Sequence, residues 1–205
     1  MTKTIYLMRH GETLFNTQKR VQGWSDSPLT ERGIAQAQAV GQYFKEQGIV
    51  FTSAYSSTQE RATDTLRLVT DAPYQQLKGL KEMNFGIFEA REEELLPKHR
   101  PGARSFEDLL VPFGGEDIRA VGSRVKEAIL SVAESDPADP ILMVSHGAAI
   151  WGLVQVLEVT FPPGVFLPNC AICQLTVENG QIRFEKLIDS AHDFKVYDFK
   201  WGGLV

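Results

Sequence analysis

The sequence has little of what marks secreted or membrane proteins. Its 205 residues include only two cysteines, too few for the disulfide framework of a small secreted domain. The apolar run near the N-terminus covers only residues 5–8, far shorter than a membrane span or the core of a signal peptide. We therefore expect a cytoplasmic protein with no membrane partner.

Excess positive charge is also missing. The net charge is -5 and the sequence pI is near 5.4, which argues against a nucleic-acid partner because binding to a phosphate backbone needs a basic surface. The hydrophobic content of 43% and the charged content of 23% are ordinary for a globular protein. With no internal repeat or linker-like tract, we predict a single domain over residues 1–205.

Helices are predicted from caps and from apolar spacing. Thr30 is a candidate N-cap of a helix that ends near Gly48. The apolar stripe of this helix would be Ile34, Ala37, Val40, Gly41 and Phe44. Ser57 and Glu60 have the spacing of a capping box that opens a helix over about residues 58–69. Further helices are predicted around residues 121–132 and after residue 147.

Strands are predicted where short apolar runs occur. Residues 5–8 and 141–144 are apolar throughout, which is typical of parallel strands buried on both faces. Residues 51–55 predict another strand, and Asn179-Gly180 predicts a hairpin between two strands near the C-terminus. Alternating strands and helices indicate an α/β fold in which helices cover both faces of the sheet, a three-layer α/β/α arrangement. Its central sheet would be mostly parallel, with an antiparallel edge strand.

Two of the four histidines directly follow the fully apolar strands. His10 comes after residues 5–8 and Arg9, and His146 comes after residues 141–144 and Ser145. In open parallel sheets, ligands bind beyond the carboxyl ends of the strands, so the two histidines should converge on one crevice. The glycines that follow them, Gly11 and Gly147, would let the backbone approach a ligand there.

The residue types at this crevice suit a phosphoryl group. Imidazole is largely neutral and nucleophilic near pH 7. Arg9 lies next to His10, and Arg61 in the first turn of the second predicted helix would bring another guanidinium to the same edge of the sheet. The N-terminus of that helix also favours an anion. Two guanidiniums and two imidazoles around one point predict a site for a phosphate ester.

Five segments of the chain resemble, in order and spacing, the motifs of the histidine phosphatase superfamily, also called phosphoglycerate mutase-like. They are Arg9-His10-Gly11-Glu12-Thr13 with Asn16, the run from Gln22 to Thr30, Ser56-Ser57 through Arg61-Ala62 with Thr65, Leu80-Lys81-Glu82 with Gly86 and Glu89, and Ser145-His146-Gly147. Two positions depart from the pattern. Gln59 stands where an apolar residue is usual, and Ala90 stands where glycine commonly follows the last glutamate.

The resemblance implies a doubly wound α/β fold and a metal-free mechanism that needs no cofactor. His10 would attack phosphorus and hold the phosphoryl group as phosphohistidine. Glu82 would protonate the leaving oxygen and then deprotonate the incoming water. The non-bridging oxygens would be held by Arg9, Arg61, His146 and Asn16, and the substrate site would also include Gln22, Gly23 and Gly147.

Hydrolysis and transfer remain to be separated at this stage. Only about two dozen residues follow the acid/base motif before Gly115, and such a short candidate lid over residues 89–115 excludes water less completely. We therefore predict a metal-independent phosphomonoester hydrolase that acts on a small phosphorylated metabolite. The alternatives are a cofactor-dependent phosphoglycerate mutase and a non-catalytic phospho-ligand binding protein. A metal-dependent hydrolase is disfavoured because Arg9 would repel a cation beside His10.

Three peripheral features give weaker expectations. The cluster Lys98-His99-Arg100 with Arg104 could meet a second anionic group of the substrate, or could simply be a solvated loop. Cys170 and Cys173 fall in a predicted strand, where we expect them to be buried thiols on opposite faces. The C-terminal aromatic residues Phe194, Tyr197, Phe199 and Trp201 should pack on the domain, with a homodimer contact as the alternative.

Overall fold

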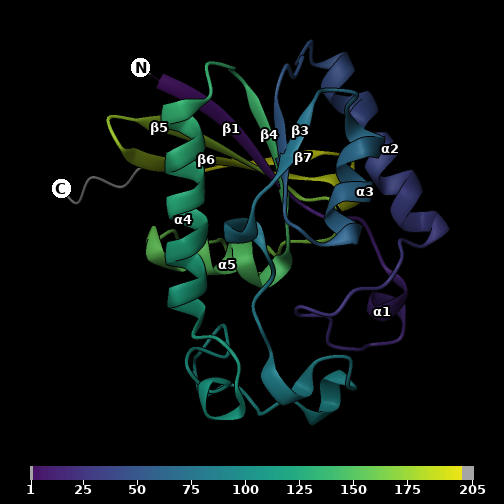
Figure 1. The fold of residues 1–205 in the computed structure, drawn as a ribbon, viewed down its shortest axis with the longest axis vertical. Coiled ribbons are helices and arrows are strands. Elements are labelled where there is room, and N and C mark those ends of the chain that lie inside the picture. The colour runs from purple at the N-terminus through teal and green to yellow at the C-terminus, as the bar shows by residue number, and fades with distance from the viewer. Residues whose placement is uncertain (1, 200–205) are drawn as a thin grey trace.

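The computed structural model describes residues 2–199, whose strands form one seven-stranded sheet in the order β3-β2-β4-β1-β5-β6-β7 (Figure 1). The strands are β1 (Thr2–Arg9), β2 (Ala54–Ser56), β3 (Tyr74–Gln76), β4 (Ile141–Ser145), β5 (Ile172–Glu178), β6 (Gln181–Asp189) and β7 (Lys195–Asp198). Strands β3, β2, β4 and β1 pair in parallel, whereas β5, β6 and β7 join antiparallel.

The parallel core agrees with the sequence prediction, but the antiparallel part has three strands rather than one. The predicted Asn179-Gly180 turn joins β5 to β6, and both of its residues have positive φ, as a tight hairpin turn requires. A second reversal after β6 then returns the chain as the short strand β7.

Helices cover both faces of the sheet, so the fold is the predicted three-layer α/β/α arrangement. The helices are α1 (Leu14–Thr17), α2 (Glu31–Glu46), α3 (Glu60–Val69), α4 (Ile118–Ser135) and α5 (Gly147–Val156). Figure 1 shows α2 and α3 on one side of the sheet and α4 and α5 on the other. Successive side chains of β1 point to opposite faces of the sheet. Ile5 and Leu7 join the core beneath α4 and α5, and Tyr6 and Met8 join the core beneath α2 and α3.

The predicted helix after Thr30 forms, with one shift in its buried stripe. Thr30 Oγ1 accepts a hydrogen bond from Gly33 N at 3.0 Å, as an N-cap should. Ile34, however, is 38% exposed. Gly33 takes the inward position instead, because the loop after β1 packs so closely that a Cβ there would lie 2.0 Å from Glu12 O. The apolar position one residue later therefore rotates toward solvent.

Residues 89–115 carry only two short 3-10 helices, η3 (Glu93–Leu95) and η4 (Val111–Phe113). In Figure 1 this segment lies with α1 beyond the end of the sheet at which β1 and β4 finish. The segment is anchored by backbone bonds to the loop after α1, including Val21 N to Arg91 O at 2.8 Å and Glu93 N to Lys19 O at 2.9 Å. Across residues 2–199, no helix is both long and apolar enough to cross a membrane.

The cysteines and the aromatic residues near the C-terminus pack as expected wherever they are described. Cys170 and Cys173 are free, buried thiols that join the cores on opposite sides of the sheet, and burial raises the pKa of Cys170 to about 12. Phe194 stacks on Tyr43 with ring centroids 4.4 Å apart. Tyr197 and Phe199 pack against the core beneath α4 and α5, and Trp201 lies outside the described residues.

Candidate active site

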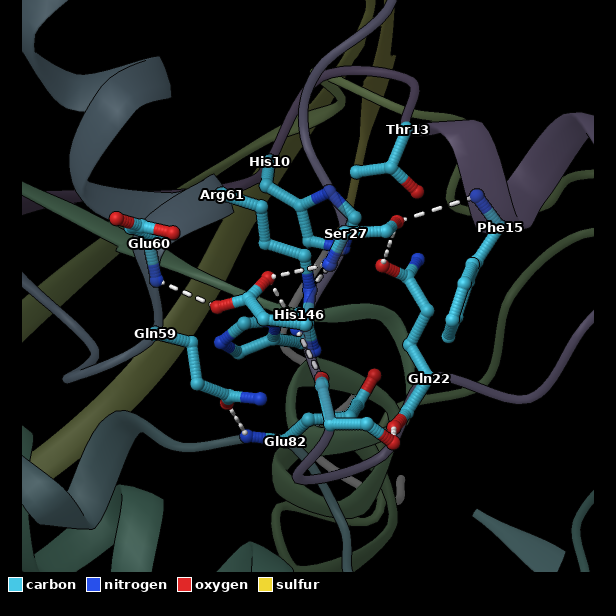
Figure 2. A network of polar contacts seen from close by, with 12 residues as sticks. His10, Thr13, Phe15, Gln22, Ser27, Gln59, Glu60, Arg61, Glu82 and His146 are labelled. Carbon is cyan, nitrogen blue, oxygen red and sulfur yellow. Dashed lines mark hydrogen bonds and ion pairs between the residues drawn. The ribbon is translucent and has the colours of Figure 1, made fainter. Parts of the chain in front are cut away.

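Both strand-end histidines lie at one edge of the sheet. Strands β1 and β4 are parallel neighbours in which Arg9 pairs with Ser145, so the next residues, His10 and His146, leave the sheet side by side. Figure 2 shows the two imidazole rings next to each other, and their centroids are 5.2 Å apart. The backbone joins them as well, since His10 N donates to Ser145 O at 3.0 Å. The convergence that topology predicts is present in the structure.

His10 is held as a neutral imidazole with one nitrogen free to react. Its Nδ1 lies 2.7 Å from Gly11 O, and because a carbonyl can only accept, Nδ1 carries the proton. Nε2 therefore keeps its lone pair, which accepts a long 3.3 Å bond from Arg61 Nε. Burial lowers the pKa of His10 well below its usual value, and the nearby charges of Arg61 and Arg9 lower it further.

His146 lies fully buried beside His10. Its Nε2 is 2.6 Å from Ser57 Oγ, which itself accepts from Gln59 N at 3.2 Å. We assign the Ser57 proton to the bond with Nε2, which leaves the imidazole proton on Nδ1. Among residues 2–199, this buried Nδ1 has no hydrogen-bond partner. Burial first, and Arg61 second, lower the pKa of His146 well below its usual value.

Ser57 does not play the helix-capping role that the sequence predicts. It does not cap α3, because its hydroxyl is engaged by His146. The helix begins at Glu60 instead, and Glu60 N donates to the carboxylate of Asp26 at 2.6 Å (Figure 2). An acidic side chain from another loop thus satisfies the helix N-terminus that the predicted capping box would have served.

A cavity of 180 Å³ opens onto His10, and its lining falls into two groups by origin. We call the residues at strand ends and helix starts the strand-end wall: Arg9, His10, Arg61, Gly147 and Ala148. We call the residues from connecting segments the loop wall: Asn16, Arg20, Val21, Gln22, Gly23, Glu82, Phe85, Glu93 and Leu96. Every predicted site residue except His146 lines this cavity.

The two arginines of the strand-end wall differ in how many protein acceptors they have. Arg61 is almost fully buried and donates to Ser25 O, to Asp26 Oδ1 and to Gly23 O, at 2.8 to 2.9 Å. Within residues 2–199, Arg9 donates through Nη1 to Leu167 O at 2.7 Å, and its buried Nε has no partner. A Cβ added at Gly147 would lie 3.3 Å from that Nε, so glycine here lets α5 start close against the guanidinium. Arg9 is the freer donor.

Glu82 lies buried at the N-terminus of α5. Its Oε1 accepts from Met83 N and Ala149 N, each at 2.8 Å, and its Oε2 accepts from Ala148 N at a longer 3.2 Å. These bonds satisfy two amides at the start of α5 and fix the carboxyl group beside the cavity. Arg124 secures the same loop by donating to Glu82 O at 2.8 Å.

Asn16, Gln22 and Gly23 border the cavity through the loop after β1. Asn16 Oδ1 accepts from Thr13 N at 3.1 Å and Gln22 Oε1 accepts from Ser27 Oγ at 3.1 Å, so each amide group keeps its nitrogen as a donor (Figure 2). Gly23 has φ +51°, and its carbonyl accepts from Arg61 Nη2. The loop thus presents donors to the cavity and fixes a strand-end arginine.

Comparison with known proteins matches residues 5–190 to the sequence model of the histidine phosphatase superfamily, branch 1. The chain belongs to this superfamily. It is 37% identical over 161 residues, or 75% of this chain and 74% of the relative, to a probable phosphoglycerate mutase GpmB of Yersinia pestis. Both the family and the fold inferred from the sequence are therefore confirmed.

Solved structures of superfamily relatives carry both mutase and phosphatase names. A phosphoglycerate mutase from Bacillus anthracis is 30% identical with a TM-score of 0.78, covering 93% of this chain and 94% of its own. A phosphoserine phosphatase from Entamoeba histolytica, solved with 3-phosphoglyceric acid, is 28% identical with a TM-score of 0.72, covering 90% and 96%. Relatives thus include a protein that binds a small phosphorylated acid.

Gln59 is a site residue that sequence reasoning noted only as a departure from the superfamily pattern. Its buried amide donates from Nε2 to Gly23 O at 2.6 Å and accepts at Oε1 from Glu82 N at 2.9 Å (Figure 2). One side chain thus connects three motifs, those carrying Gly23, Arg61 and Glu82. A polar residue at a usually apolar position was the signal that could have singled it out.

The predicted basic cluster of the insertion does not reach the cavity. Its members are absent from both walls, and Arg100 pairs instead with Glu107 at 2.8 Å and Asp108 at 2.6 Å within the insertion. His99 packs its ring edge-on against Phe106. Among residues 2–199, no cluster of three or more histidine, cysteine, aspartate or glutamate side chains is arranged to hold a metal ion.

Proposed function

We propose that this member of the histidine phosphatase superfamily hydrolyses small phosphate monoesters through a phosphohistidine formed on His10. The observation that carries the proposal is a pair of buried donors around His10, Arg9 Nε and His146 Nδ1, that have no partner among residues 2–199. The lone pair of His10 Nε2 is engaged there by a long 3.3 Å bond from Arg61 Nε. Buried donors without acceptors cost free energy, and an anionic phosphoryl group would satisfy both while placing phosphorus next to the nucleophile.

In the first step, His10 Nε2 attacks phosphorus and the bond from phosphorus to the ester oxygen breaks. The leaving oxygen takes a proton from Glu82 in its protonated form, and Arg9 with His146 stabilises the charge on the non-bridging oxygens. The uncharged state of His10 matters here because a protonated imidazole has no lone pair on Nε2.

In the second step, water attacks phosphorus and the bond from phosphorus to Nε2 breaks. The Glu82 carboxylate takes the proton of the attacking water, inorganic phosphate leaves, and His10 returns to its starting state. The position of Glu82 beside the cavity suits both proton transfers, since the same carboxyl group serves the departing and the arriving oxygen.

Cavity size and lining support a small substrate and favour hydrolysis over mutase activity. At 180 Å³ the cavity lies below the roughly 300–1,000 Å³ of sites for drug-sized ligands. The insertion supplies only Glu93 and Leu96 to the lining, so it does little to close the cavity to water. Mutase names among the relatives make phosphoglycerate mutase the second candidate.

The test is phosphate release from 4-nitrophenyl phosphate in excess chelator, comparing wild type with His10→Ala. We expect chelator-resistant release that the substitution abolishes. Activity that survives in His10→Ala would refute the nucleophile. An inactive wild type that instead interconverts phosphoglycerates when bisphosphoglycerate is added would establish the mutase, and phosphate binding without either reaction would establish a binding protein.

A further inference from the structure

The loop wall contains a cation that the proposed chemistry does not use. Arg20 lines the cavity, and within residues 2–199 its guanidinium makes no hydrogen bond and no ion pair. Its Nε is buried, and its Cζ lies 5.3 Å from the centroid of the Phe15 ring. A buried N–H donor without an acceptor is costly, and the guanidinium that carries it borders the cavity, so its position suits an anionic partner.

The backbone around Arg20 fixes where the guanidinium can reach. Arg20 N donates to Phe15 O at 2.9 Å, and Arg20 forms an isolated antiparallel bridge with Glu92 of the insertion. The neighbouring Val21 is bonded in both directions, through its N to Arg91 O and through its O to Ala90 N. Arg20 is therefore held between two bonded segments rather than at the tip of a free loop.

The acidic residue that the insertion contributes to the cavity does not neutralise Arg20. Glu93 also lines the cavity, but no ion pair joins it to Arg20 within the described residues. The rest of the loop wall near the insertion is apolar, consisting of Val21, Phe85 and Leu96. An anionic oxygen group entering this part of the cavity would find one strong, geometrically matched donor in Arg20.

We propose that Arg20 is a specificity-determining residue that binds an anionic group, a carboxylate or a second phosphoryl group, on the alcohol portion of the substrate. The inference rests on the proposed function, because it takes the phosphoryl group to be held at the strand-end wall. It also moves the second anion subsite from the predicted cluster at residues 98–104, which lies outside the cavity, to the loop after α1.

Binding to a catalytically dead background tests this subsite without depending on turnover. In His10→Ala, calorimetry would give Kd for 3-phosphoglycerate and for glycerol 3-phosphate, which differ only by a carboxylate in place of a hydroxymethyl group. A three-carbon diol bisphosphate distinguishes a phosphoryl group from a carboxylate as the second anion. We expect the better anionic ligand to bind about 10- to 100-fold more tightly than glycerol 3-phosphate.

Adding Arg20→Met should bring that ratio close to one while leaving Kd for glycerol 3-phosphate within about threefold. Arg20→Lys should keep part of the preference, because it retains the charge but not the planar fork. Glu93→Gln should increase the preference by removing a nearby negative charge. Arg91→Met is the matched control, an exposed cation outside the cavity whose loss should leave the ratio unchanged.

Two results would overturn the subsite. One is a preference that survives Arg20→Met or is absent from the start. The other is an equal loss for every ligand including inorganic phosphate, which would assign Arg20 to the phosphoryl group itself. Circular dichroism checks folding, with His10→Gln as a second background. Phosphate release by the wild type is measured in parallel. If the wild type hydrolyses phosphate esters but the Arg20 variants show no change in preference, the subsite is wrong and the phosphatase assignment stands.

Discussion

The two walls of the cavity differ in what holds their residues. The strand-end wall is fixed by the sheet, since His10 follows β1, Gly147 follows β4, and Arg61 sits in the first turn of α3. The loop wall is fixed by contacts between distant segments, such as the bonds of Gln59 to Gly23 and Glu82. A sheet edge can therefore carry the reaction that relatives share, while the loop wall can change with the substrate.

Among substitutions that affect one wall and not the other, Glu82→Gln in the loop wall should have the largest effect on activity. The amide can keep much of the hydrogen bonding at α5 but has no proton to give the leaving oxygen, so kcat/KM for an alkyl phosphate should fall about 10²- to 10⁴-fold. With 4-nitrophenyl phosphate, whose leaving group needs no proton, the loss should be much smaller. Steady-state kinetics with both esters measures the difference.

Glu94→Gln is the matched control, because Glu94 is exposed on the insertion and lies outside the cavity. It should behave as wild type with both esters. Equal losses of kcat/KM for the two esters in Glu82→Gln would contradict a proton-donating role, because kcat/KM reports the step in which the ester oxygen leaves and not the later hydrolysis of the phosphohistidine.

The second expected effect is a pH dependence of stability that belongs to the strand-end wall. In the folded protein, burial lowers the pKa of His10 and of His146, so both stay neutral at pH values where an unfolded histidine, with a pKa of about 6.5, is protonated. Below that pH the unfolded chain binds more protons than the folded one, and the free energy of unfolding falls as pH drops. Each histidine contributes at most about 1.4 kcal/mol per pH unit. His10→Gln should therefore flatten the decline between pH 7 and pH 5, as measured by urea unfolding.

The loop wall supplies the control for this effect. Arg20→Met changes charge in the same cavity without removing a buried histidine, so its decline from pH 7 to pH 5 should parallel that of the wild type. A His10→Gln protein with the wild-type slope would show that His10 is not held neutral by the fold.

A smaller effect should come from cutting the connection between the walls. Gln59→Leu leaves Glu82 N without its acceptor and Gly23 O with the bond from Arg61 Nη2 alone. We expect kcat to fall about 10-fold with little change in KM, because the loop that carries the acid/base group loses a fixed contact. Gln59→Glu keeps an acceptor for Glu82 N and should lose less. Exposed Gln75→Leu is the control. An unchanged kcat in Gln59→Leu would show that the walls are positioned independently.

The smallest effect should come from the predicted basic cluster. Arg100 is paired with Glu107 and Asp108 on the surface, so Arg100→Ala should leave kcat/KM within about twofold for neutral and anionic esters alike. Competition between the two esters in one assay would detect a small preference. A selective loss on the anionic ester would return the second anion subsite to the insertion.

The sequence could predict the strand-end wall from its residue pattern, but it could not predict the loop wall in the same way. Residues 5–8 and 141–144 were recognisable as buried parallel strands, and that alone places His10 and His146 at one edge of the sheet. Glu82, Asn16, Gln22 and Gly23 came only from the resemblance to the superfamily. Loop residues have no periodicity to reveal which way they face, so pattern reasoning has no means to place them.

The residues that were missed depend on long-range contacts. Arg20 reaches the cavity because its neighbours pair with residues 90–93, some seventy positions away, and nothing local encodes that pairing. Among the strands, β3 and β7 were missed for a related reason. Both are short, lie at the two edges of the sheet, and are largely exposed, so they lack the apolar pattern of a central strand.

Direct trapping of the phosphoenzyme tests the central claim, that the strand-end wall carries a nucleophilic histidine. Wild-type protein mixed with a ³²P-labelled ester and quenched in alkali should show an acid-labile, alkali-stable label on the peptide that contains His10. His10→Ala should show none. Continued hydrolysis by the wild type with no label during turnover, or a label on any other residue, would contradict the account.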